Sequence, residues 1–206
     1  MTDVIDRAAD RKRIAESIVA DLDLVRRWQR FGRPVFVGGF ACDLLVDPDI
    51  DMEIYCWDLK IEHGFAVLGE CALNQRVVKA RFSNELAGRD QALYWQLRYR
   101  QDDATEWKID MWSAPADYDL PRGEHLVEPM RAALTRETRK VILELKERRA
   151  RDLSLRCRSL DLYRAVLDDN VRTAEQLRTW LESHETGRLS DWKPKRTSRS
   201  ARASDG

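Results

Sequence analysis

The 206-residue sequence predicts an α/β protein: a mixed, twisted sheet flanked by helices, followed by a C-terminal α-helical domain. Apolar and polar residues alternate strictly over 49–55, 95–100 and 107–111, a pattern typical of half-buried strands. Beyond residue 129 the apolar residues recur every three or four positions, which is the helical period. A stable core is expected, because 43% of the residues are apolar and seven are tryptophan.

The first elements are a helix, a strand and a second, short helix. Residues 3–31 carry one apolar helical face, formed by Ile14, Ile18, Val25 and Trp28. Glycine and proline then end this helix, and residues 35–37 form a short apolar strand. Gly38 and Gly39 make a turn into a short helix over residues 40–46, which the Asp-Pro dipeptide after it ends.

The middle of the chain completes the sheet. In the strand at 49–55, aspartate and glutamate occupy one face and isoleucine and methionine the other. A helix over 60–73 and a strand over 76–82 follow. The strands at 95–100 and 107–111 are joined by a polar stretch that fits a hairpin loop.

The change of pattern along the chain predicts three parts. Residues 1–125 form the α/β domain, 126–187 a helical domain, and 188–206 a disordered tail rich in Ser, Arg and Lys. The last helix is expected to begin at Thr173, because Gln176 completes a capping box with it.

Composition limits the partners and the compartment. Basic and acidic residues balance at 36 each, so no global basic field holds a polyanion, and nucleic acid is expected to be an unlikely partner. The charged N-terminus shows no signal peptide, and no apolar run is long enough for a membrane span. The cysteines are widely spaced and are read as free thiols of a cytoplasmic protein: Cys42, Cys56, Cys71 and Cys157.

Three aspartates are the candidate catalytic and metal-binding residues. Asp49 and Asp51 lie two positions apart and project from the same strand face, and Asp110 lies on the polar face of a later strand. Carboxylate oxygens suit Mg²⁺, which also takes water and substrate phosphates as ligands. The turn at Gly38 and Gly39 lets backbone N–H groups approach a phosphate closely. Together these features favour a site for a nucleoside triphosphate and Mg²⁺.

With these residues in place, the sequence resembles the DNA polymerase β-like nucleotidyltransferase superfamily, including small antibiotic-modifying adenylyltransferases and minimal nucleotidyltransferases. The resemblance rests on Gly38-Gly39, Asp49-Ile50-Asp51-Met52 and Asp110. It implies the nucleotidyltransferase sheet and a two-ion mechanism with Mg²⁺, or Mn²⁺ in its place. Asp49 and Asp51 would bind both ions, and Asp110 would bind the second ion and act as general base.

The expected activity is transfer of a nucleoside monophosphate, AMP from ATP or the equivalent from another NTP, to a hydroxyl of a small molecule, with release of pyrophosphate. Two alternatives stay open: adenylylation of a partner protein, and a non-catalytic nucleotide- or RNA-binding module.

Other readings of the acidic stretch fit less well. A calcium loop needs glycine where Met52 stands, and glycosyltransferases with a DxD motif place a larger nucleotide-binding unit before it than the 48 residues preceding Asp49. Glu53 is either a fourth ligand or a solvated strand residue, and Asp43 either supports the glycine turn or is exposed. Five basic residues on polar strand faces either meet phosphate or are solvated: Lys79, Arg81, Arg98, Arg100 and Lys108.

Overall fold

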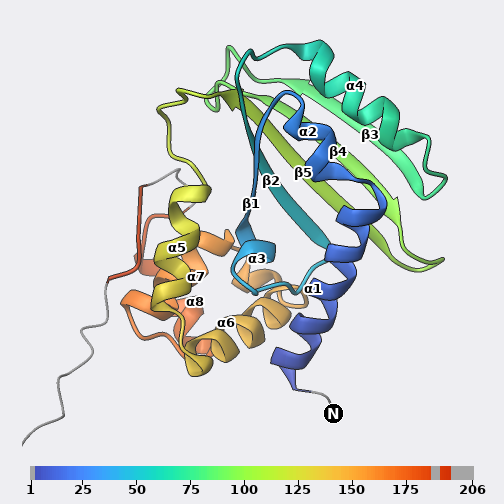
Figure 1. The fold of residues 1–206 in the computed structure, drawn as a ribbon. Coiled ribbons are helices and arrows are strands. Elements are labelled where there is room, and N and C mark those ends of the chain that lie inside the picture. The colour runs from blue at the N-terminus through green and yellow to red at the C-terminus, as the bar shows by residue number, and fades with distance from the viewer. Residues whose placement is uncertain (1–2, 187–190, 196–206) are drawn as a thin grey trace, which may run out of the picture. The chain divides into compact units, whose positions relative to one another are not determined.

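A computed structural model describes residues 3–186 and 191–195 of the chain (Figure 1). The chain divides into two compact units, Met1–Val127 and Glu128–Gly206. The disordered tail expected from residue 188 lies mostly outside the described residues. Within the short segment at 191–195, the indole of Trp192 donates a hydrogen bond of 2.7 Å to the carboxylate of Asp168.

The first unit contains a five-stranded mixed sheet in the order β1-β2-β5-β4-β3. Its strands are β1 (Gly32–Val37), β2 (Asp49–Cys56), β3 (Val77–Asn84), β4 (Leu93–Arg100) and β5 (Glu106–Pro115). The central pair β2–β5 is parallel, and the other three pairs are antiparallel. The predicted fold class is therefore confirmed. Pro34 is accommodated in β1 because this strand is at the edge of the sheet.

Three helices of the first unit cover one face of this sheet (Figure 1). They are α1 (Val4–Asp21), α2 (Leu24–Gln29) and α4 (Ile61–Ala72). Their apolar residues pack on the inward-facing residues of β2, β4 and β5, and Trp28 and Trp95 are completely buried there. Since the apolar positions of the strands all lie on this side, the polar positions lie on the opposite face of the sheet.

Two local features differ from the sequence-based expectation. The helix expected over 3–31 is interrupted, because Asp23 adopts a left-handed conformation with φ 48° between α1 and α2. The short helix expected over 40–46 instead occupies Gly38–Ala41 as α3. Asp43 is also left-handed, with φ 56°, so the helix cannot continue past it.

The second unit is helical. Its helices are α5 (Glu124–Ala133, which begins at the end of the first unit), α6 (Arg136–Arg149), the 3₁₀ turn η1 (Leu153–Leu155), α7 (Ser159–Asp168) and α8 (Ala174–Ser183). The capping box of Thr173 and Gln176 is present and confirms the predicted start of α8. Pro129, expected to end a connection, lies inside α5.

Among the described residues, no helix combines the length and the apolar character that crossing a bilayer requires.

Candidate metal and nucleotide site

The structure brings the three predicted aspartates together. Asp51 on β2 lies directly opposite Asp110 on β5, and Asp49 lies one row away on the same face. Each contributes a carboxylate oxygen to a group whose members all lie within 4.8 Å of one another. The parallel pairing of β2 and β5 creates this cluster, since it aligns two strand segments that are far apart in the sequence.

Asp110 is held by three donors on the polar face. The hydroxyl of Tyr94 and the amide of Gln96 donate to its Oδ1 at 2.8 and 3.0 Å, and Lys108 Nζ donates to its Oδ2 at 2.7 Å. Gln96 is the direct cross-strand neighbour of Asp110 on β4. Burial and the hydrogen bond to Asp110 raise the pKa of Tyr94 to about 12, so this phenol stays protonated as a donor at neutral pH. These contacts fix the orientation of the Asp110 carboxylate.

Lys108 links two of the carboxylates. Its Nζ lies 3.1 Å from Asp49 Oδ2 and 2.7 Å from Asp110 Oδ2. Burial raises the pKa of Asp49, and the positive charge of Lys108 opposes that shift. Burial also disfavours the charged form of Lys108, but its hydrogen bonds and the two negative charges win and raise its pKa. The ammonium group therefore supplies part of the positive charge that this acidic cluster needs.

The glycine turn lies against the same cluster. Gly38 has φ 63°, a left-handed conformation that favours glycine. A Cβ atom built on Gly38 would lie 2.5 Å from Asp51 Oδ2, so a side chain at this position would displace the carboxylate. The backbone of Gly38 and Gly39, which together begin α3, is therefore placed beside Asp51.

The donor set fits a divalent cation. Three carboxylates converge, and the Oδ1 atom of Asp49 is buried without a hydrogen-bond partner among the residues that the structure describes. A buried oxygen of this kind is costly unless a donor or a cation satisfies it. Oxygen ligands in this number suit Mg²⁺ or Mn²⁺.

Glu53, left open as a fourth ligand, has a different role. Its carboxylate accepts hydrogen bonds from the backbone N–H groups of Gly123 and Glu124 at 2.7 and 3.1 Å, and from the hydroxyl of Tyr55 at 2.6 Å. A carboxylate at this place satisfies the unpaired N–H groups at the start of α5. Asp43, the other undecided acid, forms an ion pair with Lys12 of α1.

The sequence alone did not identify Tyr94 and Gln96 as partners of Asp110. The alternation in β4 places Gln96 on the polar face, but the register between β4 and β5 is needed to place it opposite Asp110. The hydroxyl of Tyr94 reaches Asp110 from the neighbouring row, where its ring packs against Trp112 at a centroid distance of 4.8 Å.

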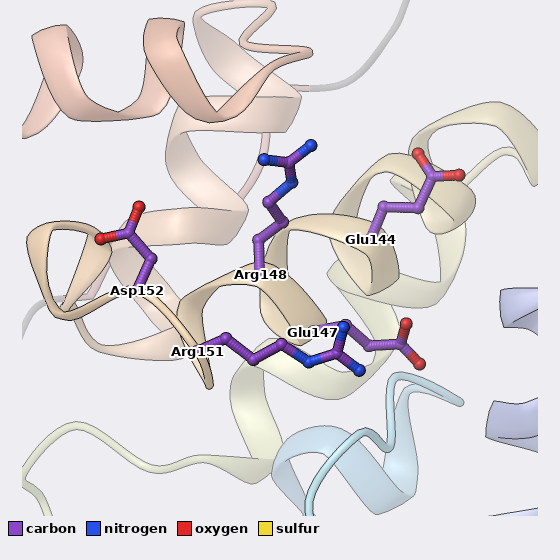
Figure 2. A pocket seen from close by; sticks show the side chains of 5 residues that line it. All are labelled: Glu144, Glu147, Arg148, Arg151 and Asp152. Carbon is purple, nitrogen blue, oxygen red and sulfur yellow. The ribbon is translucent and has the colours of Figure 1, made fainter.

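A hollow of about 550 Å³ lies in the second unit (Figure 2). Its lining side chains extend from α6 and the turn that follows: Glu144, Glu147, Arg148, Arg151 and Asp152. Carboxylates and guanidinium groups both line it, so the lining has no dominant charge and does not by itself indicate a class of ligand.

Comparison with known proteins gives matches in structure only. No family model and no curated protein sequence matches the chain. Among solved structures, the Cid1 poly(U) polymerase with Mg and 3'-dATP aligns with 74% of this chain and 48% of its own, at a TM-score of 0.54 and 15% identity. A cytoplasmic RNA terminal U-transferase aligns with 80% of this chain and 53% of its own, at a TM-score of 0.53 and 13% identity. The chain thus spans about half the length of these enzymes.

These similarities correct one expectation. From the sequence, a small-molecule acceptor is expected and nucleic acid is an unlikely partner. This expectation is contradicted, because the similar structures are those of a poly(U) polymerase and an RNA terminal U-transferase. The expectation relied on the net charge of zero. Net charge is a sum over the whole chain, and it does not describe how charge is distributed over one face.

The arrangement of the sheet agrees with the solved structures over most of the chain, and the carboxylates predicted from the sequence meet on its polar face. The chain therefore has the nucleotidyltransferase fold, as its resemblance to the DNA polymerase β-like superfamily predicted.

Proposed function

We propose that the protein is a divalent-metal-dependent nucleotidyltransferase that transfers a nucleoside monophosphate from ATP or another NTP to the 3'-hydroxyl of an RNA, releasing pyrophosphate. The observation that carries this proposal is the convergence of Asp49, Asp51 and Asp110 beside the turn at Gly38. Carboxylates next to an accessible backbone turn provide the two things that a metal-bound triphosphate needs, which are oxygen ligands and room for phosphate.

Each residue of the site has a specific task in this proposal. Asp49 and Asp51 would hold the cation, and Asp49 would supply its Oδ1, which has no hydrogen-bond partner among the described residues. A bound cation would lower the pKa of the acceptor hydroxyl and offset the charge that develops on the phosphates. The turn at Gly38 and Gly39 admits the triphosphate close to the backbone.

Asp110 binds the cation in this proposal, and the same carboxylate is the candidate general base. Both of its oxygens already accept hydrogen bonds, from Tyr94, Gln96 and Lys108. Each carboxylate oxygen has two lone pairs, so Oδ2, which accepts from Lys108, keeps a lone pair for a cation or for the proton of the acceptor hydroxyl. The same contacts keep the carboxylate in one orientation, which favours a ligand.

RNA is proposed as the acceptor because solved structures with this fold include a poly(U) polymerase and an RNA terminal U-transferase. In the chain itself, the strands next to Asp110 carry the predicted basic residues on the same face of the sheet. Phosphate groups near the 3' end of an RNA would be attracted to that face.

The test is an extension assay. The purified chain is incubated with Mg²⁺ or Mn²⁺, each of the four nucleoside triphosphates in turn, and a labelled single-stranded RNA, and the products are separated on a denaturing gel. We expect the RNA to be lengthened and pyrophosphate to be released. An otherwise identical RNA with a 3'-deoxy end is the matched control and should stay unchanged, because it lacks the attacking oxygen.

Two variants connect the activity to the site. Asp51→Asn and Asp110→Asn should each lower the transfer rate by at least about 100-fold, since each removes a charged ligand. Asp58→Asn is the control, because this exposed acid, at 66% side-chain exposure, follows the end of β2 and leaves the three carboxylates intact. Pyrophosphate release without RNA extension, with label appearing on a protein, would contradict the RNA acceptor and favour protein modification.

A further inference from the structure

A row of basic side chains leads across the sheet to the carboxylates. The cross-strand register places Lys79 of β3 opposite Arg98 of β4, and Arg98 opposite Lys108 of β5. Directly opposed residues of neighbouring strands point to the same face. Lys108 is in turn opposite Asp49 of β2, so this row runs from the basic edge of the sheet to the acidic cluster.

The next row also ends at the carboxylates, with one basic residue at its other end. Arg81 of β3 lies opposite Gln96 of β4, Gln96 lies opposite Asp110 of β5, and Asp110 lies opposite Asp51 of β2. We name Lys79, Arg81 and Arg98 the basic strip. Strands are spaced by about 4.8 Å, so the strip begins one strand away from Asp110 and ends roughly 10 Å from it.

The charges of the basic strip are not neutralised within the described residues 3–186 and 191–195. Neither Lys79, Arg81 nor Arg98 has a carboxylate within 4.0 Å there. Other basic residues of the same sheet do: Arg33 pairs with Glu124, and Arg100 pairs with Glu106. Lys79 and Arg81 are exposed and Arg98 is half-buried. Three positive charges without an ion pair in the described part of the chain, beside the cluster of carboxylates, suit the binding of phosphate groups.

The geometry of the proposed reaction separates two sources of phosphate. The glycine turn follows β1, on the β1 side of the carboxylates, whereas the basic strip is on β4 and β3, on the other side. In phosphoryl transfer the attacking and leaving oxygens are roughly in line on opposite sides of the phosphorus. If the triphosphate tail lies at Gly38, the attacking hydroxyl approaches from the direction of β4.

We infer that the basic strip binds the backbone phosphates of the acceptor RNA immediately before its 3' end. This inference rests on the proposed function, and it assigns the acceptor path to one face of the first unit. The distance from Asp110 to the far end of the strip is comparable to the span of a terminal dinucleotide. The basic strip contacts phosphate groups and not the bases, so it binds a single-stranded end without a preference for base sequence.

The test compares two triple variants with equal loss of charge. One carries Lys79→Gln, Arg81→Gln and Arg98→Gln. The control carries Arg13→Gln, Arg26→Gln and Lys60→Gln, which remove three exposed charges from α1, α2 and the start of α4, on the helix-covered side of the sheet. Pairs of this exposed kind contribute little to stability. Binding of a labelled single-stranded RNA of roughly 15 nucleotides is measured by anisotropy over a range of salt concentrations.

We expect the strip variant to bind RNA at least about tenfold more weakly than the control at low salt. Each phosphate contact with a single strand contributes about 0.7 to the slope of log affinity against log salt, so the slope should fall by about 2. Binding of an ATP analogue with Mn²⁺, measured by calorimetry, should change less than twofold. If Arg98→Gln impairs folding, the double variant of the two exposed residues should lower the slope by about 1.4.

Three results would overturn the inference, and they are distinguishable. If the wild-type chain extends RNA and the strip variant binds RNA as the control does, the acceptor path lies elsewhere while the proposed function stands. If the strip variant loses nucleotide binding as strongly as RNA binding, the strip holds the triphosphate. If the wild-type chain neither binds nor extends RNA, the proposed function fails together with the inference.

Discussion

Replacing Lys108 with methionine tests how the acidic cluster is balanced. Methionine keeps most of the length of the side chain and removes the ammonium group that lies 2.7 Å from Asp110 and 3.1 Å from Asp49. We expect two consequences. The metal-free protein should lose stability, because the carboxylates then repel each other without compensation, and the cluster should bind a divalent cation more tightly, because the cation no longer competes with a resident positive charge.

The burial of the pair sets the size of the stability effect. Breaking a buried ion pair costs about 3–5 kcal/mol, and breaking an exposed pair costs about 0–1 kcal/mol. The side chains of Lys108, Asp49 and Asp110 are 30%, 30% and 15% exposed, which is between these limits. We therefore expect Lys108→Met to lower the free energy of unfolding by about 1–3 kcal/mol in the presence of a chelator.

Urea unfolding with EDTA and with Mn²⁺ measures both effects. A tenfold gain in Mn²⁺ affinity would increase the stabilisation by saturating metal by about 1.4 kcal/mol. Lys79→Met is the control, because it removes an equal charge from an exposed position without an ion pair among the described residues, and it should change stability by less than about 0.5 kcal/mol. If Mn²⁺ raises the free energy of unfolding of the Lys108 variant by no more than that of the wild type, the ammonium group does not compete with the cation and the reasoning is refuted.

Two further predictions concern packing and thiol chemistry. A Cβ on Gly64 of α4 would lie 2.2 Å from the ring of Trp95, so Gly64→Ala should destabilise the protein by at least about 1 kcal/mol in urea unfolding. Gly69→Ala, on the same helix, should instead stabilise the protein by up to about 1 kcal/mol, because a Cβ there would have no atom of the described residues within 4 Å. Equal effects of the two changes would contradict the close packing. Burial raises the pKa of Cys56 from 9.0 to about 11, which makes its thiolate about 100-fold scarcer at neutral pH, so its reactivity should increase about tenfold per pH unit and level off only near pH 11. Burial raises the pKa of Cys157 as well, but this half-buried thiol is more accessible than the buried Cys56 and should react first with iodoacetamide at pH 8, as peptide mass spectrometry would show. Faster labelling of Cys56 would be inconsistent with its burial.

The sequence predicts the strands and their faces well, because alternation depends only on neighbouring residues. It does not contain the register between strands. That Asp51 lies opposite Asp110, and Gln96 opposite Asp110 on its other side, follows from the pairing of distant segments. The role of Glu53 could not be predicted for the same reason. Its carboxylate accepts hydrogen bonds from the backbone N–H groups of Gly123 and Glu124, and Gly123 lies 70 positions later in the chain.

Two helices were predicted with the wrong bounds, and each difference has a local cause. A left-handed residue such as Asp23 interrupts a helix without any change in the apolar pattern, so periodicity alone cannot reveal the break between α1 and α2. The short helix after β1 begins at Gly38 and not at residue 40, because a pair of glycines that usually indicates a turn can also begin a helix.

The position of Lys108 and Asp110 on the same strand has a consequence for how the sheet is assembled. β2 is synthesised early and carries several carboxylates on its polar face, while its parallel partner β5 follows about 50 residues later. Parallel pairing over such a separation is slow, because the entropy of closing the loop is lost before the contacts between the strands can form. An acidic strand arriving alone would also be repelled. Since β5 brings Lys108 next to Asp110, the strand carries a counter-charge for the acidic face of β2, which lowers the repulsion between the two strands before any metal ion is bound.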